Sequence, residues 1–174
     1  NETWKDVYGY LGKNKNKPLN DEDFLQDHWI IYFGYTRSNK VTYSSFLLND
    51  YFTQNNISDK QIMNLSDNDT EDYQIENVDI SEIENSDENE TVDNKKEKLT
   101  LNNISKYINS MKTLIPYWYI LQNPDDSDIN ISIKAMLQKL NRLQFVYFKP
   151  LVTVLLSKND ISIEKKVECL QKIE

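Results

Sequence analysis

His28 is the chain's only histidine and Cys169 its only cysteine, so these two residues limit the nucleophilic and metal chemistry open to it. A zinc site needs several His, Cys or carboxylate ligands that converge, and these two lie 141 positions apart. A catalytic His28 would need a nucleophile and an orienting acid, and the sequence identifies neither. We therefore expect no catalytic, cofactor-binding or metal-binding residue here, and a buried His28 hydrogen-bonded to a backbone carbonyl or a carboxylate.

The common catalytic and nucleotide-binding motifs are missing from the sequence. Three glycines, at positions 9, 12 and 34, cannot make a phosphate-binding loop, and no GxSxG, HExxH or CxxC pattern occurs. Cys169 lies among apolar residues of a helical pattern, so we expect a buried, unreactive thiol. A single cysteine excludes an internal disulfide and fits a reducing cytoplasm.

Basic side chains are the remaining groups that could act on a ligand, by contacting phosphates. One cluster comes early in the chain and consists of Lys13, Lys15 and Lys17. A second surrounds a predicted helix and its exit, and its members are the candidate DNA contacts Lys134, Lys139, Arg142 and Lys149. Solvated helix faces are the better explanation of such lysines. Two arginines in the whole chain are few for reading bases, because bidentate base contacts favour Arg.

The acidity of the chain is concentrated in one segment. Residues 66–94 hold twelve Asp and Glu and no Lys or Arg, whereas the whole chain has a net charge of −8, so the rest carries +4. Few large apolar residues occur in this segment, and it cannot bury enough surface to offset the entropy of ordering. We expect residues 66–98 to form an acidic, mobile insert.

Composition favours helices as the elements that position these side chains. Of 174 residues, three are Gly and four are Pro, whereas a sheet protein of this size needs many tight turns. No apolar run reaches the length of a membrane span. The chain begins at Asn1 and ends inside a helical pattern, so we expect a piece of a longer protein. The prediction is an all-α fold: a single irregular bundle of about six to eight helices with the long acidic insert.

Apolar residues at three- and four-residue steps locate the helices. The stretch FLQDHWIIYFGYTR, residues 24–37, follows the N-cap Asn20 and has two adjacent apolar stripes, so its helix should be central, with Gly34 weakening its end. Pro116 should kink or split the helix in which it lies. The other helices are predicted over residues 2–11, 43–53, 58–65 and 101–121, from Asn130 or Ser132 to Leu143, within residues 148–158, and after the cap Ser162 to the end of the chain.

Two of these predicted helices carry more specific expectations. The helix over residues 2–11 should place Trp4, Val7, Tyr8 and Leu11 on one face. Residues 151–156 are nearly all apolar and would also suit a buried strand, but their helical neighbours and the lack of an evident partner strand favour a helix.

Four stretches, taken together, resemble one protein family. They are DEDFLQDHWIIYFGYTR (21–37), YSSFLLNDYF (43–52), ISKYINSMKTLIPYWYILQNP (104–124) and MLQKLNRLQFVYFKPLVTVLL (136–156). Their order and spacing are similar to the middle, helical region of GmrSD-type proteins, which resemble type IV, modification-dependent restriction enzymes. The resemblance covers most of residues 1–65 and 99–174, and the acidic insert matches nothing in the family's pattern.

The resemblance implies a longer parent protein and no catalysis in this piece. Family members typically carry a ParB-like N-terminal domain with a DGQQR motif and often a C-terminal HNH nuclease domain. This chain has neither motif, so none of the family's catalytic residues can be placed on it. The implied cofactors, a nucleoside triphosphate and a divalent metal, would belong to the parent. The implied partners are the flanking domains of the same parent chain and DNA, with no membrane.

The function predicted on this basis is a non-catalytic helical scaffold in a phage-defence DNA endonuclease, connecting a nucleotide-binding domain to a nuclease domain. Residues 1–65 and 99–174 would be two parts of one bundle, separated by the insert at 66–98. Two alternatives stay open. One is a stand-alone helical module that docks a protein partner through exposed aromatics, and the other is a helical DNA-binding domain.

Overall fold

The computed structural model describes residues 2–34, 42–57, 98–143 and 146–173. These residues form an all-α fold, as the composition and periodicity predicted. Among them the one β contact is an isolated parallel bridge between Ile57 and Leu99. The helix predicted over residues 58–65, and the acidic insert apart from Lys98, lie outside the described residues.

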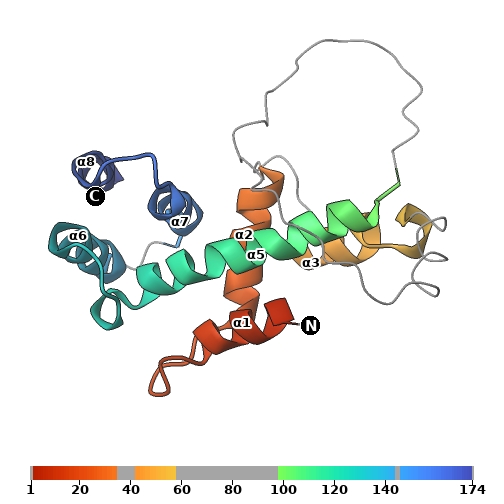
Figure 1. The fold of residues 1–174 in the computed structure, drawn as a ribbon, viewed down its shortest axis with the longest axis horizontal. Helices are drawn as coiled ribbons and strands as arrows, with labels where there is room; N and C mark the ends of the chain where they lie inside the picture. The colour runs from red at the N-terminus through yellow and green to blue at the C-terminus, as the bar shows by residue number, and fades with distance from the viewer. Residues whose placement is uncertain (1, 35–41, 58–97, 144–145, 174) are drawn as a thin grey trace, which may run out of the picture.

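Figure 1 shows the longest helix, α5, running along the molecule, with α2 crossing it, α6 to α8 gathered toward one end and α3 toward the other. The α-helices are α1 (Glu2–Leu11), α2 (Asp21–Phe33), α3 (Tyr43–Ser45), α5 (Leu101–Gln122), α6 (Ile131–Arg142), α7 (Lys149–Ser157) and α8 (Ile163–Ile173). Three short helical segments accompany them: η1 (Phe46–Tyr51), η2 (Gln54–Asn56) and η4 (Pro124–Asp126). The segment 151–156 is therefore helical, as predicted.

Polar residues next to the helix starts supply the hydrogen bonds that first-turn N–H groups need. The Asn20 side chain accepts from the backbone N–H of Glu22 at the start of α2. Thr100 and Asn103 form a reciprocal capping box on α5. At the other end of α2, Gly34 adopts the left-handed conformation with φ of 59° and donates its N–H to the carbonyl of Ile30. Gly34 thus closes the helix, whereas we had expected it only to weaken that end.

The segment after Thr42 is helical, as predicted, but it changes pitch. Three residues of α3 lead directly into η1, which is a π-helix. The N–H of Phe52 donates to the carbonyl of Leu47, five residues back, at 2.8 Å. Apolar spacing does not distinguish this wider helix from an α-helix over so short a stretch, so the sequence gives no signal for it.

Pro116 does not split its helix, since α5 continues through it to Gln122. A proline lacks the N–H that would reach the carbonyl four residues back, so the helix tolerates one missing bond near its middle. The neighbouring residues Ile115 and Trp118 are almost fully buried. Packing of this part of α5 offsets the local cost, because tertiary contacts supply most helix stability in proteins.

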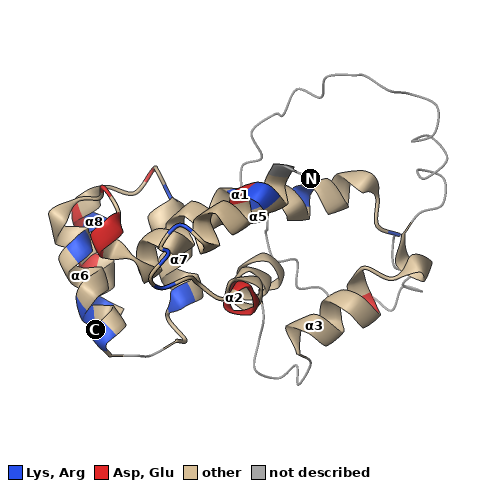
Figure 2. Ribbon diagram, turned by 90° about the horizontal axis from the view of Figure 1, so that it is seen from below, with Lys and Arg blue, Asp and Glu red and all other residues tan. Residues whose placement is uncertain are grey.

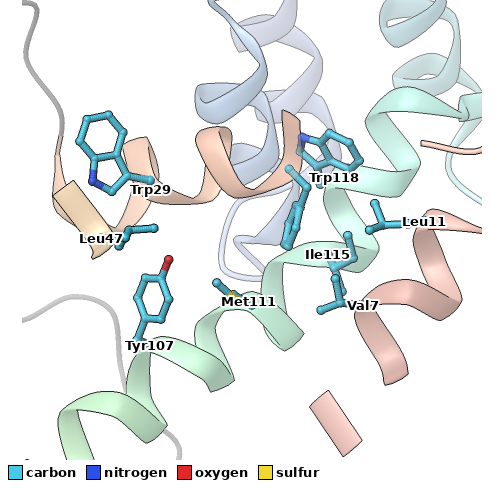
Figure 3. Close-up of a cluster of buried hydrophobic side chains, with 9 residues drawn as sticks. Val7, Leu11, Trp29, Leu47, Tyr107, Met111, Ile115 and Trp118 are labelled. Carbon is cyan, nitrogen blue, oxygen red and sulfur yellow. The ribbon is translucent and has the colours of Figure 1, made fainter. Parts of the chain in front are cut away.

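The buried core consists of two side-chain clusters, both of which use α5. The aromatic cluster, part of which Figure 3 shows, contains Val7, Leu11, Phe24, Trp29, Leu47, Tyr107, Met111, Ile115 and Trp118. The aliphatic cluster contains Leu121, Ile133, Met136, Leu137, Leu140, Val152, Leu156 and Leu170. The N-terminal elements and the C-terminal helices therefore pack against successive parts of one helix, and α2 also contacts α7 directly.

The buried face of α1 differs from the predicted one. Val7 and Leu11 are buried, as expected, but Trp4 is 38% exposed and Tyr8 55% exposed. The face of α1 that contacts α5 is turned away from Trp4 and Tyr8, toward the side of the helix that carries Asp6. On that side the Asp6 carboxylate pairs with the Lys112 ammonium group at 3.0 Å. The Trp4 and Tyr8 rings lie side by side, tilted by 34° with their centroids 5.9 Å apart.

Candidate nucleic-acid interface

His28 is buried between α2 and α5, with 1% of its surface exposed. Its Nε2 lies 2.7 Å from the Ser110 hydroxyl oxygen. That hydroxyl donates its own proton to the backbone carbonyl of Tyr107, also at 2.7 Å, so Nε2 must be the donor toward Ser110. The burial we predicted is confirmed, but the partner is a hydroxyl and not the expected carbonyl or carboxylate.

The His28 and Ser110 pair is not arranged as a nucleophile and its base. A catalytic histidine must accept the serine proton, and an acid must hold its other ring nitrogen. Here the Ser110 proton is committed to a carbonyl, and Nδ1 of His28 has no hydrogen-bond partner among the described residues. Burial lowers the pKa of His28 from 6.5 to about 4, so the ring is neutral at neutral pH. Packing and one polar contact account for this histidine.

Asp27 faces a different environment from its neighbour His28. Its carboxylate accepts a hydrogen bond of 2.8 Å from the indole Nε1–H of Trp118. Burial raises the pKa of Asp27 from 3.8 to about 6, although the Trp118 hydrogen bond and the positive charge of Lys149 both oppose the rise. The acid therefore lies at the junction of α2, α5 and the start of α7, within electrostatic reach of a candidate DNA contact.

The four candidate DNA contacts do not all lie at one site. On α6, the Lys134 ammonium group donates to the carbonyl of Asp125 at 3.3 Å, next to an acidic side chain. Lys139 and Arg142 lie in the last turn of the same helix. Lys149 starts α7 and is half-buried. Figure 2 shows basic and acidic positions mixed where α6 and α8 lie.

Lys149 instead shares a pocket with Lys17, a residue of the earlier basic cluster. The two lysines line one pocket of about 260 Å³ between the loop after α1 and the ends of α5, α6 and α7. The remaining lining residues are Gln122, Leu140, Asn141, Val146 and Phe148. Both lysines were candidate phosphate contacts from the sequence, but in separate clusters. Their proximity, across 132 positions of sequence, could not be read from spacing.

Asn14 fixes the backbone next to Lys17. Its amide nitrogen donates to the side-chain oxygens of Asn123 and Asp126, each at 3.1 Å. Its side-chain oxygen Oδ1 accepts the backbone N–H groups of Asn16 and Lys17. A turn anchored at both ends in this way restricts the loop. In the same loop, the Lys13 ammonium group lies 4.9 Å from the centre of the Tyr119 ring, a cation–π contact.

Within the described ranges no group of three or more His, Cys, Asp and Glu side chains could hold a metal ion. Cys169 is half-buried and not fully buried as predicted, because α8 packs through Leu170, which is fully buried. No helix of the described residues combines the length and apolarity that crossing a membrane requires.

Comparisons with known protein families, with curated proteins and with solved structures each found no match for this chain. A function must therefore be argued from features of the chain itself, which are an aromatic core, a buried acid and a basic pocket.

Proposed function

We propose that this chain is the non-catalytic helical scaffold of a modification-dependent DNA endonuclease, joining a nucleotide-binding domain to a nuclease domain and contacting DNA phosphates. The observation that carries the proposal is where the four family-like stretches lie. They supply α2, α3 with η1, α5, and α6 with α7, and each contributes to the buried clusters. Residues such as Phe24, Trp118 and Leu137 are fully buried. The stretches that carry the proposed resemblance therefore lie in the packed core, which supports a scaffold role.

The basic residues support contact with DNA in this scaffold. Lysines that neutralise phosphates release counterions, so binding weakens steeply as salt rises. Lys139 and Arg142 at the end of α6, and Lys17 with Lys149 at the pocket, lie on elements that meet around Leu140 and Asn141. Lysine-dominated contacts position a duplex without reading its sequence, and this agrees with a scaffold whose specificity comes from other domains.

The test uses the purified 174-residue chain. We expect it to fold, to bind duplex DNA with an affinity that falls as salt rises, and to show neither nucleotide hydrolysis nor DNA cleavage. The double charge reversal K139E/R142E should weaken DNA binding, while K5E/K106E, which makes the same charge change at exposed positions of α1 and α5, serves as the matched control. Turnover in a clean preparation would refute the scaffold proposal, and salt-independent or absent DNA binding would refute the DNA contact.

A protein-interaction module is the second candidate, and the exposed aromatic pair on α1 favours it. Trp4 and Tyr8 expose 38% and 55% of their surfaces on one side of a helix whose other side is buried. Aromatic residues of this kind are enriched in protein interfaces. If this function is correct, the chain should self-associate or capture a flanking domain, and W4A/Y8A should abolish the association in a variant that circular dichroism shows to be folded. A strictly monomeric chain that binds no flanking domain would exclude it.

A further inference from the structure

We propose that the pocket lined by Lys17 and Lys149 binds a phosphate group, held between the two ammonium groups. The inference adds a ligand class and the residue Lys17 to the proposed DNA contact. A free nucleotide and a nucleic-acid backbone present the same phosphate group. Only the assignment of that phosphate to DNA rests on the proposed function. Its chemical basis is the pocket itself.

The first argument is charge. Among the described residues neither lysine makes a salt bridge with a carboxylate, although the Asp27 charge acts on Lys149 from within the protein. Two cationic residues from unrelated parts of the chain, the loop after α1 and the first residue of α7, thus line one pocket. Like charges that converge repel one another, and an anion between them relieves that repulsion.

The helix ends around the pocket must be weighed against this charge. The pocket includes Gln122, the last residue of α5, and Asn141, near the end of α6, and helix C-termini each carry about half a negative charge. The N-terminus of α7 supplies about half a positive charge, and no side chain caps it. Two full lysine charges and the N-terminus of α7 outweigh the two C-terminal ends. The Asp27 carboxylate, whose charge acts on Lys149, reduces this positive balance without reversing it, so the balance favours an anion.

The third argument is the remaining lining. Leu140, Val146 and Phe148 form an apolar wall, which lowers the local dielectric and strengthens the attraction of a lysine for an anion. Asn141 is held in place, since its amide nitrogen donates to the carbonyl of Leu121 at 2.7 Å. Gln122 adds a side-chain amide that can donate to a phosphate oxygen.

The size of the pocket agrees with a phosphate and what it is attached to. Its volume of about 260 Å³ is slightly below the lower end of pockets for drug-sized ligands, about 300 Å³. It exceeds by several times the share of a single water molecule, about 30 Å³. A phosphate with part of its sugar is accommodated, whether it is free or part of a strand.

The experiment is a titration of the ¹⁵N-labelled 174-residue chain with inorganic phosphate at constant ionic strength. We expect saturable shifts at the side-chain amides of Gln122 and Asn141. K17Q and K149Q should each weaken phosphate binding about fivefold. The control K158Q removes the same charge at the far end of α7, outside the pocket, and should leave binding unchanged. Shifts that do not saturate, or an equal loss in K158Q, would overturn the inference.

Variant stability is checked so that a folding defect is not taken for lost binding. Lys17 lies in an exposed loop, and K17Q should keep the thermal midpoint of the parent chain. If K149Q unfolds, K149R retains the charge and should bind phosphate, which keeps Lys149 testable. Loss of binding in a folded K149R with unchanged binding in K17Q would contradict a site that depends on two cations.

Two further arms separate the sources of the phosphate. Adenosine 5′-monophosphate should bind at the same amides, whereas adenosine, which has no phosphate, should not. Duplex DNA should also bind, and K17Q should reduce the slope of log affinity against log salt by about one. If the monophosphate binds but DNA does not, the pocket stands and the DNA role of the proposed function fails. If DNA binds with the same affinity in K17Q and K149Q and the monophosphate titration does not saturate, the DNA role stands and the pocket inference fails.

Discussion

The indole Nε1–H of Trp118 on α5 donates a 2.8 Å hydrogen bond to the Asp27 carboxylate on α2, linking residues 91 positions apart. Trp118 is also a fully buried member of the aromatic cluster, with its ring centroid 5.4 Å from that of Phe24. The carboxylate is therefore drawn into an environment that disfavours its charge. Burial raises the Asp27 pKa to about 6, so this acid changes charge just below neutral pH.

The first prediction is that D27N stabilises the chain at neutral pH. An acid with a raised pKa in the folded state costs stability above that pKa, and the cost disappears as the pH falls toward the unfolded value of 3.8. A pKa change of one corresponds to about 1.4 kcal/mol. D27N should therefore raise the free energy of unfolding by up to about 3 kcal/mol at pH 7 and by little at pH 4. Urea unfolding at both pH values measures the difference. D27A, which removes the acceptor of the Trp118 N–H, should gain less.

The second prediction concerns His28, whose linkage has the opposite sign. Burial lowers its pKa to about 4, so folding excludes a proton that the unfolded chain binds below pH 6.5. Stability from this residue is present above pH 6.5 and is lost as the pH falls to 4, by about 3 kcal/mol. H28Q retains a donor toward Ser110 but cannot titrate. The stability of H28Q relative to the parent chain should therefore rise as the pH falls from 7 to 4. A constant stability difference across that range would contradict a neutral, buried His28.

Local sequence signals predicted the elements better than the contacts between them. Asn20, Thr100 and Pro150 lie at helix starts because capping and the fixed φ of proline act within one turn. The exposure of Trp4 was mispredicted because apolar spacing defines a stripe without saying which edge of it a neighbouring helix covers. The Asp6 and Lys112 ion pair, which marks that edge, joins residues far apart in sequence.

The residues of the candidate site were also easier to predict than the contacts between them. The sequence identified Lys17 and Lys149 as basic residues in two clusters, but their convergence depends on the loop that Asn14 anchors to Asn123 and Asp126. An asparagine in a loop is compatible with many partners. The hydrogen bond between His28 and Ser110 was equally hidden, because a serine inside a helix gives no sign of what lies opposite it.

The third prediction compares two buried tyrosines that differ in hydrogen bonding. The Tyr107 hydroxyl has no partner among the described residues, and Figure 3 shows it directed toward Trp29 and Leu47. The Tyr119 hydroxyl donates to the Asp126 carboxylate at 3.3 Å. An unsatisfied buried polar group costs about 1–3 kcal/mol, whereas a made hydrogen bond contributes about 1 kcal/mol. Y107F should therefore stabilise the chain by about 1 kcal/mol and Y119F should destabilise it by a similar amount. Denaturant midpoints measure both, and a destabilised Y107F would show that its hydroxyl is satisfied by a buried water.

The fourth prediction uses two glycines that have equal space but different backbone conformations. A Cβ built on Gly9 or on Gly34 meets nothing within 4 Å, so neither substitution is limited by packing. Gly9 lies inside α1, where alanine is favoured over glycine by about 1 kcal/mol, and G9A should stabilise the chain by up to that amount. Gly34 has a φ of 59°, where a Cβ is strained, so G34A should destabilise it by about 1 kcal/mol. Thermal midpoints that move in opposite directions would support left-handed closure of α2, and an unchanged G34A midpoint would mean that α2 ends in some other way.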